Sequence, residues 1–263
     1  MEQHNPSIRD EALVLMRRGV TNRAVAERLN VPRGTVSWWR HEDRKRRGEL
    51  VKVRPSMLCP RCDGRALDRP AYAYLLGLYL GDGHISHYAK HKVPSLMISC
   101  DDAWPGLQDA TEAALRTVFP HNATCRVRSK GSHNIKVYFK HLACLFPQHG
   151  PGKKHQRPIE LASWQQEIVD EHPWEFIRGL IHSDGSRITN WTEKIIGGQR
   201  KRYEYTRYFF SNASSDILRL FTDTLDKVGV DWRSANQARL VQNISVAKKA
   251  SVALMDAHVG PKH

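Results

Sequence analysis

Two segments of the sequence share one pattern, an apolar helical run with small residues four positions apart that ends in Asp-Gly. They span residues 74–83 and 176–185. Residues four apart lie on one face of a helix, so each run predicts a helix with a smooth stripe that lets two backbones approach closely. If these helices pack in parallel, the acids that follow the stripes meet at their C-terminal ends. The small residues and acids of the two segments are Gly77, Gly81 and Asp82, and Gly179, Ser183 and Asp184.

The pair of acids predicts a metal site. Two neighbouring carboxylates repel each other, and the partial negative charge of two helix C-termini adds to the repulsion. A shared divalent cation with oxygen ligands, Mg²⁺ or Mn²⁺, relieves it. We therefore expect Asp82 and Asp184 to hold the ion, with the main-chain carbonyls of Gly81 and Ser183 as further ligands. The alternative is a pair of core helices that merely end in Asp-Gly.

Segments 75–83 and 177–185 resemble the LAGLIDADG motif of the homing endonuclease family. The two acids lie 184 − 82 = 102 residues apart, a distance that suits one structural repeat. The resemblance implies a single-chain protein with two motifs that cleaves double-stranded DNA across the minor groove, one scissile phosphate per repeat. It also implies a basic side chain beside each site. Lys140 and Lys249, which are equivalent in the repeats, are the predicted catalytic lysines.

The rest of residues 71–263 predicts an α+β fold of two αββαββα repeats, a pseudo-dimeric saddle over one DNA duplex. Repeat one is 71–147, the connection is 148–172, and repeat two is 173–263. Equivalent helix and strand positions are offset by 217 − 107 = 110 and 243 − 134 = 109 residues. The 109 − 102 = 7 extra residues fit a longer first hairpin in repeat two, where the segment 197–201 interrupts the strands. The predicted strands are 84–90, 93–100, 123–130, 134–140, 186–192, 203–211, 231–240 and 243–247.

Residues 1–52 predict a small all-α domain similar to the helix-turn-helix of many bacterial DNA-binding proteins. Thr21 is placed to cap the second helix, and a third helix starts near Arg33. In that motif the last helix enters the major groove, while Val36 and Trp39 are expected in the core. The alternative is a three-helix unit that contacts proteins. The residues predicted to face DNA are Arg33, Thr35, Ser37, Trp38 and Arg40.

Residues 53–70 form a predicted linker with one Cys-x-x-Cys turn, Cys59 and Cys62. The turn is half of a zinc ribbon, and tetrahedral zinc needs four ligands. A turn completed by nearby histidines and a remnant of an ancestral ribbon both remain open, and zinc is not the favoured interpretation. The remaining cysteines are predicted to be small buried side chains: Cys100, Cys125 and Cys144.

Composition indicates a nucleic-acid partner. The formal net charge is +14 and the pI about 9.8, as expected for a protein that binds a polyanion. The segment 148–155 lacks the spacing of a phosphate-binding loop, so no nucleotide cofactor is expected. Without an apolar span or signal region, and with an odd number of cysteines, we expect a cytoplasmic, nucleoid-associated monomer that acts as a pseudo-dimer. Predicted DNA contacts from the sheets are Arg126, Arg128, Lys130, Arg187 and Arg207.

Two functions compete for this pattern. The first is a metal-dependent, site-specific DNA endonuclease. The second is a DNA-binding transcription regulator that keeps the fold without cleavage, as known regulators joining such a fold to a helix-turn-helix do. Those regulators have typically lost the acid pair, so the presence of Asp82 and Asp184 favours the nuclease. An RNA-splicing maturase ranks last, because a helix-turn-helix reads duplex DNA.

Overall fold

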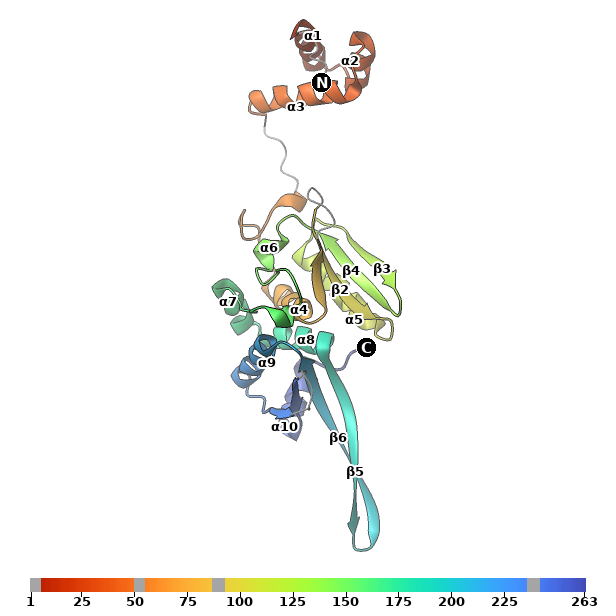
Figure 1. The fold of residues 1–263 in the computed structure, drawn as a ribbon, viewed down its shortest axis with the longest axis vertical. Helices are drawn as coiled ribbons and strands as arrows, with labels where there is room; N and C mark the ends of the chain where they lie inside the picture. Colours follow the sequence, from red (N-terminus) through yellow and green to blue (C-terminus); the bar gives the residue numbers. More distant parts are fainter. Residues whose placement is uncertain (1–5, 50–54, 87–92, 236–241) are drawn as a thin grey trace. The chain divides into compact units, whose positions relative to one another are not determined.

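The computed structural model describes residues 6–49, 55–86, 93–235 and 242–263. The chain divides into two compact units, Met1–Arg54 and Pro55–His263, and each is described by itself. Figure 1 shows the helices and strands of both units. No helix within the described ranges is long and apolar enough to cross a membrane.

The first unit consists of three short helices around a small core. They are α1 (Pro6–Arg17), α2 (Asn22–Leu29) and α3 (Arg33–Arg46). The Thr21 hydroxyl accepts the backbone N–H of Ala24 at 3.3 Å and caps α2 as predicted. Asn30, in the left-handed conformation with φ 51°, ends that helix. Val36 and Trp39 are buried, so their predicted core positions are confirmed.

The second unit contains the order αββαββα twice, which confirms the predicted α+β fold class. A connection with a further helix, α7 (Ser163–Glu171), joins the repeats, and the sequence of residues 148–172 did not predict it. The first repeat is α4 (Arg69–Leu80), β1 (Gly83–Ser86), β2 (Ser95–Asp101), α5 (Pro105–Val118), β3 (Thr124–Ser129), β4 (Ser132–Tyr138) and α6 (Leu142–Leu145). The second is α8 (Pro173–Asp184), β5 (Gly185–Ile196), β6 (Gln199–Asn212), α9 (Ser215–Lys227), β7 (Arg233–Ala235), β8 (Gln242–Val246) and α10 (Lys249–His258).

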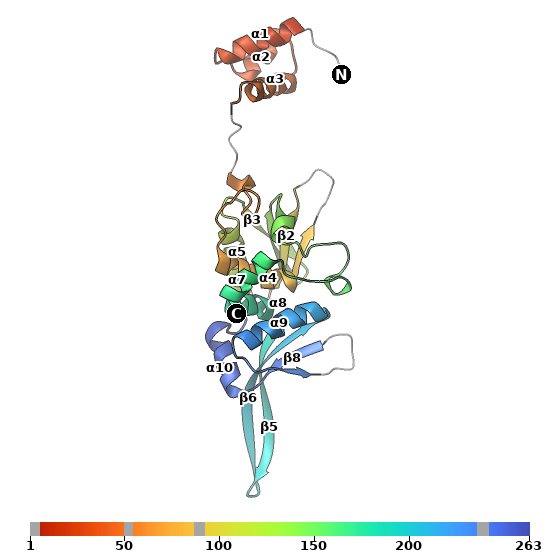
Figure 2. The ribbon, with the colours of Figure 1, turned by 90° about the vertical axis from the view of Figure 1, so that its left-hand side faces the viewer.

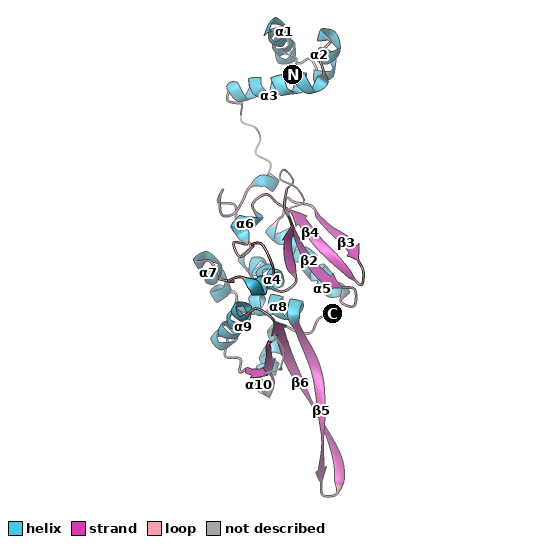
Figure 3. Ribbon diagram, viewed as in Figure 1, coloured by secondary structure: helices cyan, strands magenta, loops and turns pink. Residues whose placement is uncertain are grey.

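The two sheets have the same antiparallel strand order, β1-β2-β4-β3 and β5-β6-β8-β7. In the first sheet Leu96 pairs with Ile85 on one side and Val137 on the other, and all three are buried. Because side chains alternate along a strand, this set faces the helices and the residues between them face the open side. Figure 3 shows the sheets on either side of the paired helices α4 and α8.

The hairpin β5–β6 is longer than predicted. Its pairing runs without a break from Gly185–Phe210 to Ile196–Gln199. Gly197 (φ 58°) and Gly198 (φ 78°) form the two-residue turn, and both take the positive φ that a type I′ hairpin turn requires. The first hairpin of repeat two is thus longer than that of repeat one, as predicted, but the segment 197–201 does not interrupt its strands beyond the two-residue turn.

Among the described residues, most of this long hairpin has two strands. The third strand, β8, pairs with β6 there over Tyr208 to Asn212. Beyond that point β5 and β6 extend as a two-stranded ribbon, which Figures 1 and 2 both show reaching away from the rest of the second unit. The predicted strands 84–90 and 231–240 extend partly outside the described residues.

Candidate active site at the paired helix ends

Helices α4 and α8 contact each other backbone to backbone, as their small-residue stripes predict. A Cβ added to Gly77 would lie 2.6 Å from the carbonyl oxygen of Phe176. One added to Gly179 would lie 3.0 Å from the Gly77 Cα and would collide with the carbonyl oxygen of Tyr74. Only residues without a side chain fit at this crossing, so the glycines fix how closely the two motif helices approach.

The close packing brings the two acids together. Gly81 ends α4, and a Cβ placed on it would collide with the Ser183 side chain and lie 3.0 Å from the Asp184 carboxylate. Asp82 follows directly in sequence. Asp82 is exposed and Asp184 partly exposed, so solvent and ions can reach both, although the surrounding protein still desolvates the two carboxylates. The predicted meeting of the two helix ends is present in the structure.

The surroundings of both carboxylates raise their pKa values. Burial by the surrounding protein, followed by the neighbouring Asp184 carboxylate, raises the pKa of Asp82 to about 6. Burial also raises the pKa of Asp184, and the Asn212 side-chain amide opposes the shift by donating a 2.7 Å hydrogen bond. An acid whose negative charge is disfavoured in this way gains from a nearby cation.

Two lysines already lie beside the acids. The Lys154 ammonium donates to the carbonyl oxygens of Tyr79 (2.5 Å), Leu80 (3.0 Å) and Gly81 (2.5 Å) at the end of α4. The Lys262 ammonium donates to the carbonyl of Ser183 at 2.7 Å near the end of α8. Each lysine therefore compensates the partial negative charge of one helix C-terminus.

Burial lowers the pKa of both lysines. The pKa of Lys154 falls to about 8, and the negative charges of Asp184 and Asp82 limit the fall. The pKa of Lys262 is lowered by burial and held up by the same acids, Asp82 first. Four ionisable groups of opposite charge thus form one coupled cluster at the two helix ends.

The acids and lysines line two separate cavities. Asp184 and Lys154 line a cavity of about 1200 Å³, which also receives Asn212. Asp82 and Lys262 line a second one of about 310 Å³. Each cavity therefore pairs the acid of one motif with the lysine that caps the helix of the other motif.

The two cavities are not identical. Gly83 pairs with Ile98 and Gly185 with Phe210, so two residues further along the strands Cys100 occupies the position equivalent to Asn212. Asp184 therefore receives an amide donor that its counterpart Asp82 lacks at the matching position.

The structure does not bring the predicted lysines to the acids. Lys140 follows β4 and Lys249 begins α10; both are exposed, and neither lines the two cavities. The sequence holds a signal for the residues that do lie there. Lys154 and His155 follow Pro-Gly-Lys, and Lys262 and His263 follow Gly-Pro, an offset of 262 − 154 = 108 residues that is close to the offset of the repeats.

His182, within the second motif, packs in the interior. Its Nδ1 lies 2.9 Å from the Tyr74 hydroxyl, and the two rings meet edge to face. Burial, followed by the positive charge of Arg178, lowers the pKa of His182 to about 4, so the ring is neutral at pH 7.

Two of the arginines predicted to contact DNA lie on the helix-covered side of their sheets. Arg126 pairs with the α5 acids Asp109 and Glu112 at 2.5 and 2.7 Å. Arg187 donates twice to Asp256 of α10, at 2.7 and 3.0 Å. Arg126 lies opposite the buried Ile135 and Arg187 opposite the buried Tyr208, so their placement does not support the predicted contact of these two arginines with DNA.

The other predicted sheet residues are Arg128, Lys130 and Arg207, and the last of these is partly buried. Arg128 has the same strand parity as Arg126, and Lys130 follows β3 in the turn; both are exposed. Arg207 lies on the open side, where its guanidinium covers the ring of Tyr205 at 4.8 Å. Strand residues that alternate with the buried ones lie on the open side of each sheet, and several of them were not predicted from the sequence. They include Lys136, Asn134, Cys125 and, in the second sheet, Arg233.

Helix α3 presents most of its predicted DNA-facing residues to solvent. Arg33 and Ser37 are exposed, and 56% of the surface of Trp38 is accessible. Thr35 and Arg40 are partly buried. The Asn22 side chain at the start of α2 donates to the Ser37 hydroxyl (3.0 Å) and accepts from Arg40 (2.9 Å), which fixes the orientation of α3 against α2.

Two of the three cysteines that were predicted to be buried are exposed or partly exposed. Cys100 is buried as expected, but Cys125 is exposed on β3. Cys144, predicted to be buried, is partly exposed beside the Cys59–Cys62 turn.

No family model and no curated protein matches the chain. Among solved structures, the crystal structure of I-DmoI in complex with DNA and Mn matches with 15% identity and a TM-score of 0.49, over 74% of this chain and 98% of that chain. The N-terminal LAGLIDADG domain of DUF199/WhiA matches with 11% identity and a TM-score of 0.44, over 79% of this chain and 89% of that chain. These likenesses concern the fold alone.

Proposed function

We propose that this protein is a site-specific DNA endonuclease that depends on a divalent cation. The observation that carries the proposal is the pair of helix ends, where Asp82 and Asp184 each face a cavity that also holds a lysine. Two adjoining acids repel anionic phosphates, so they oppose DNA binding unless a cation accompanies them. Two such cavities suit a reaction that cuts both strands of one duplex.

The donor set fits a hard cation. Two carboxylates with raised pKa values offer oxygen ligands of the kind that Mg²⁺ and Mn²⁺ prefer. The carbonyls of Gly81 and Ser183 accept hydrogen bonds from lysines, and each carbonyl has a second lone pair. When bound by Asp82 and Asp184, the ion would activate a water molecule and stabilise charge on the scissile phosphate.

The chain's own residues have distinct parts in this proposal. Lys154 and Lys262 place positive charge beside each acid, where it stabilises the negative charge that develops on the phosphoryl oxygens. With a pKa of about 8, Lys154 can also exchange a proton at Nζ near neutral pH. Asn212 orients the Asp184 carboxylate, and its hydrogen bond opposes the rise of the Asp184 pKa.

The DNA-binding surface is proposed to be the open side of both sheets together with the β5–β6 ribbon. The major groove of B-DNA admits a two-stranded β-ribbon. The ribbon exposes apolar and aromatic side chains that a water-exposed hairpin does not need, including Trp191 (55% exposed) and Ile195 (73%). The basic residues at its turn are suited to phosphates: Lys194, Arg200, Lys201 and Arg202. Helix α3 is proposed to read a further stretch of duplex through Arg33, Ser37 and Trp38.

A DNA-binding regulator is the second candidate, and one observation favours it. Lys154 and Lys262 occupy the carbonyls of Gly81 and Ser183 and neutralise the acids without metal. In this alternative the charge cluster is only a structural joint between the repeats, and the protein binds DNA without cutting it.

The deciding experiment exposes a randomised duplex library to the protein with Mg²⁺ or Mn²⁺ and sequences every new end. The double variant Asp82→Asn, Asp184→Asn runs in parallel. New ends with a shared sequence, present only with the intact acids, support the nuclease. An enriched bound fraction without new ends supports the regulator.

A further inference from the structure

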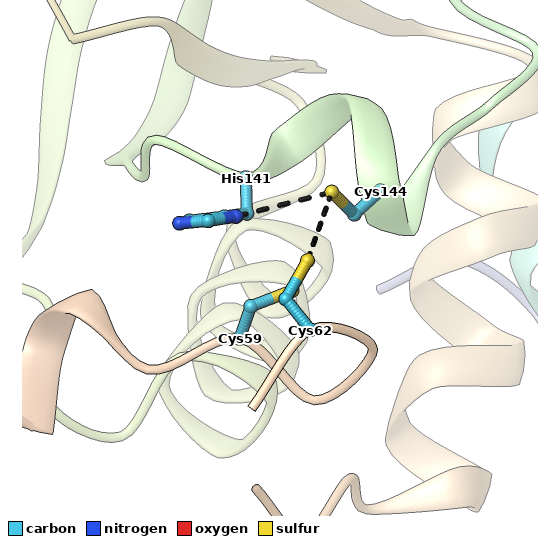
Figure 4. A group of neighbouring side chains, drawn as sticks. All are labelled: Cys59, Cys62, His141 and Cys144. Carbon is cyan, nitrogen blue, oxygen red and sulfur yellow. Dashed lines mark hydrogen bonds between the residues drawn. The ribbon is translucent and has the colours of Figure 1, made fainter. Parts of the chain in front are cut away.

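A group of metal-binding side chains lies outside the site described above, where the start of the second unit packs on the end of its first repeat. The turn that contains Cys59 and Cys62 lies against the start of α6. The sulfur atoms of this turn are close to the ligand atoms of His141, which precedes α6, and of Cys144 within it. In Figure 4 the Cys144 sulfur lies between the Cys62 sulfur and the nearer ring nitrogen of His141. The four potential ligand atoms all lie within 4.8 Å of one another.

The distances agree with one tetrahedral ion. In a zinc site with Zn–S of about 2.3 Å and Zn–N of about 2.0 Å, neighbouring sulfurs are ~3.8 Å apart and sulfur and nitrogen ~3.6 Å apart. The observed separations are 3.5 Å between the Sγ atoms of Cys62 and Cys144 and 3.9 Å between the Cys144 Sγ and the His141 Nδ1. Small side-chain movements would centre an ion between all four groups.

The turn that carries two of the ligands is already shaped to present them. The Asp63 carboxylate accepts the backbone N–H of Cys59 at 2.8 Å, and the Asp63 N–H donates to the Cys59 carbonyl at 2.9 Å. Cys59 is fully buried, Cys62 is exposed, and His141 and Cys144 are partly exposed, so an ion could enter the site from solvent.

Other contacts hold the turn in place from both sides. Arg65 donates to the carbonyl of Val118 at 2.8 Å, and Arg61 covers the ring of Trp164 at 4.7 Å. The ligand spacing is Cys-x-x-Cys in the turn and His-x-x-Cys at α6. His141 and Cys144 are the two further ligands that a zinc site at the Cys-x-x-Cys turn needs, and the sequence alone did not identify them.

We infer that Cys59, Cys62, His141 and Cys144 form a structural Zn²⁺ site that fastens residues 55–68 to the end of the first repeat. Three thiolates and an imidazole are ligands that zinc prefers, and four protein ligands close the site against substrate. The site joins segments 82 residues apart in sequence. It therefore acts as a clamp at the point where the linker enters the second unit.

A disulfide between Cys62 and Cys144 is the competing interpretation of the same neighbourhood. It would leave Cys59 and His141 without a role, although their ligand atoms lie within 4.8 Å of the other two. The two interpretations differ in metal content and in the number of free thiols, so they can be separated by direct measurement.

The test uses the full chain with Asp82→Asn and Asp184→Asn, so that no metal is counted at the paired acids. It is purified without chelator, and metal is measured by mass spectrometry. We expect close to one zinc per chain, released when a mercurial reagent blocks the thiols. Replacing the zinc with Co²⁺ should give the visible absorption of a tetrahedral cobalt–thiolate centre, a measurement on the unaltered cluster.

Variants then assign the ligands. Cys62→Ser and Cys144→Ser should each lose most of the zinc, whereas Cys125→Ser, which alters an exposed cysteine on β3, should keep it. His141→Cys should retain zinc and shift the cobalt spectrum toward that of four thiolates. The inference is overturned if the full chain, refolded with Zn²⁺, binds none and gives no tetrahedral cobalt spectrum. It is equally overturned if peptide mapping finds Cys62 joined to Cys144 in protein prepared under reducing conditions.

Discussion

At the scale of single residues, the structure differs most from the sequence-based prediction in which lysines lie at the helix ends. Repeat alignment selects Lys140 and Lys249, because both follow a fourth strand. The structure instead brings in Lys154 from the connection and Lys262 from the C-terminal segment. Neither belongs to a predicted helix or strand, so no periodicity could mark them. The one sequence signal for these two lysines is that Pro, Gly, Lys and His recur together at 151–155 and 260–263.

The lysines give a first prediction. If Lys154 stabilises charge on the scissile phosphate, Lys154→Met should lower the cleavage rate by about 10²-fold while DNA affinity changes little. Lys140→Met should stay within a few-fold of the wild-type rate. Single-turnover cleavage of a mapped target measures both. Equal losses in the two variants would remove Lys154 from the proposed chemistry.

The raised pKa of Asp82 gives a second prediction, about stability. Because the folded pKa of about 6 lies above the unfolded value of 3.8, the folded state binds more protons between these pH values. Its contribution to the free energy of unfolding is therefore fully present below pH 3.8 and is lost as pH rises through 6. In EDTA, Asp82→Asn should be more stable than wild type at pH 7.5, and the gain should shrink as pH falls below 6.

Urea unfolding at several pH values measures this difference, with Asp223→Asn, an exposed acid of α9, as the control that should show no such trend. Adding Mg²⁺ should stabilise the wild type and leave the double Asp82→Asn, Asp184→Asn variant unchanged. A gain that is the same at every pH would contradict the electrostatic cause.

At the scale of elements, the crossing of α4 and α8 is predictable in detail. Spacing alone identifies Gly77 and Gly179 as contact points, since a stripe of small residues in a helix has few other uses. The ribbon of β5 and β6 is not predictable in this way. The two glycines at 197 and 198 suggest an interruption as readily as a turn, because glycine both breaks strands and forms the tightest hairpin turns, and the pattern does not distinguish these uses.

The helix crossing gives a third prediction. Gly77→Ala should lower the free energy of unfolding of the second unit by about 1–3 kcal/mol or more, because the new Cβ meets backbone, which cannot move aside as a side chain can. Gly150→Ala is the matched control, since its Cβ would make an ordinary 3.4 Å contact with the Arg157 side chain. Chemical unfolding followed by tryptophan fluorescence compares them. If both variants unfold alike, close backbone contact is not what sets the crossing.

At the scale of the whole molecule, the repeated strand order shows one chain that supplies both halves of a two-fold arrangement. The sequence predicts this because both copies keep the motif and the alternation of strands. It does not predict which face of each sheet stays open, because charged residues such as Arg126 occur on the helix-covered side in ion pairs.

The first unit supports a fourth prediction. If α3 contacts phosphates, deleting residues 1–52 should weaken DNA binding and reduce the slope of log affinity against log salt by about 0.9 for each phosphate that α3 neutralises. Binding titrations over a range of salt concentrations measure the slope. An unchanged slope would mean that the first unit does not touch DNA, and the cleavage chemistry should be unaffected in either case.

The mismatch between Asn212 and Cys100 has a consequence for the order of events on DNA. If the protein cleaves DNA as proposed, the two strands should be cut at unequal rates, since Asp184 has an amide donor and Asp82 does not. A supercoiled plasmid with one target should pass through a nicked circle before it becomes linear, and Cys100→Asn should shorten the life of that circle. A nuclease with two unlike cleavage sites in one chain would thus keep its DNA nicked in one strand for a time. An assembly of two identical subunits has no built-in difference between its sites.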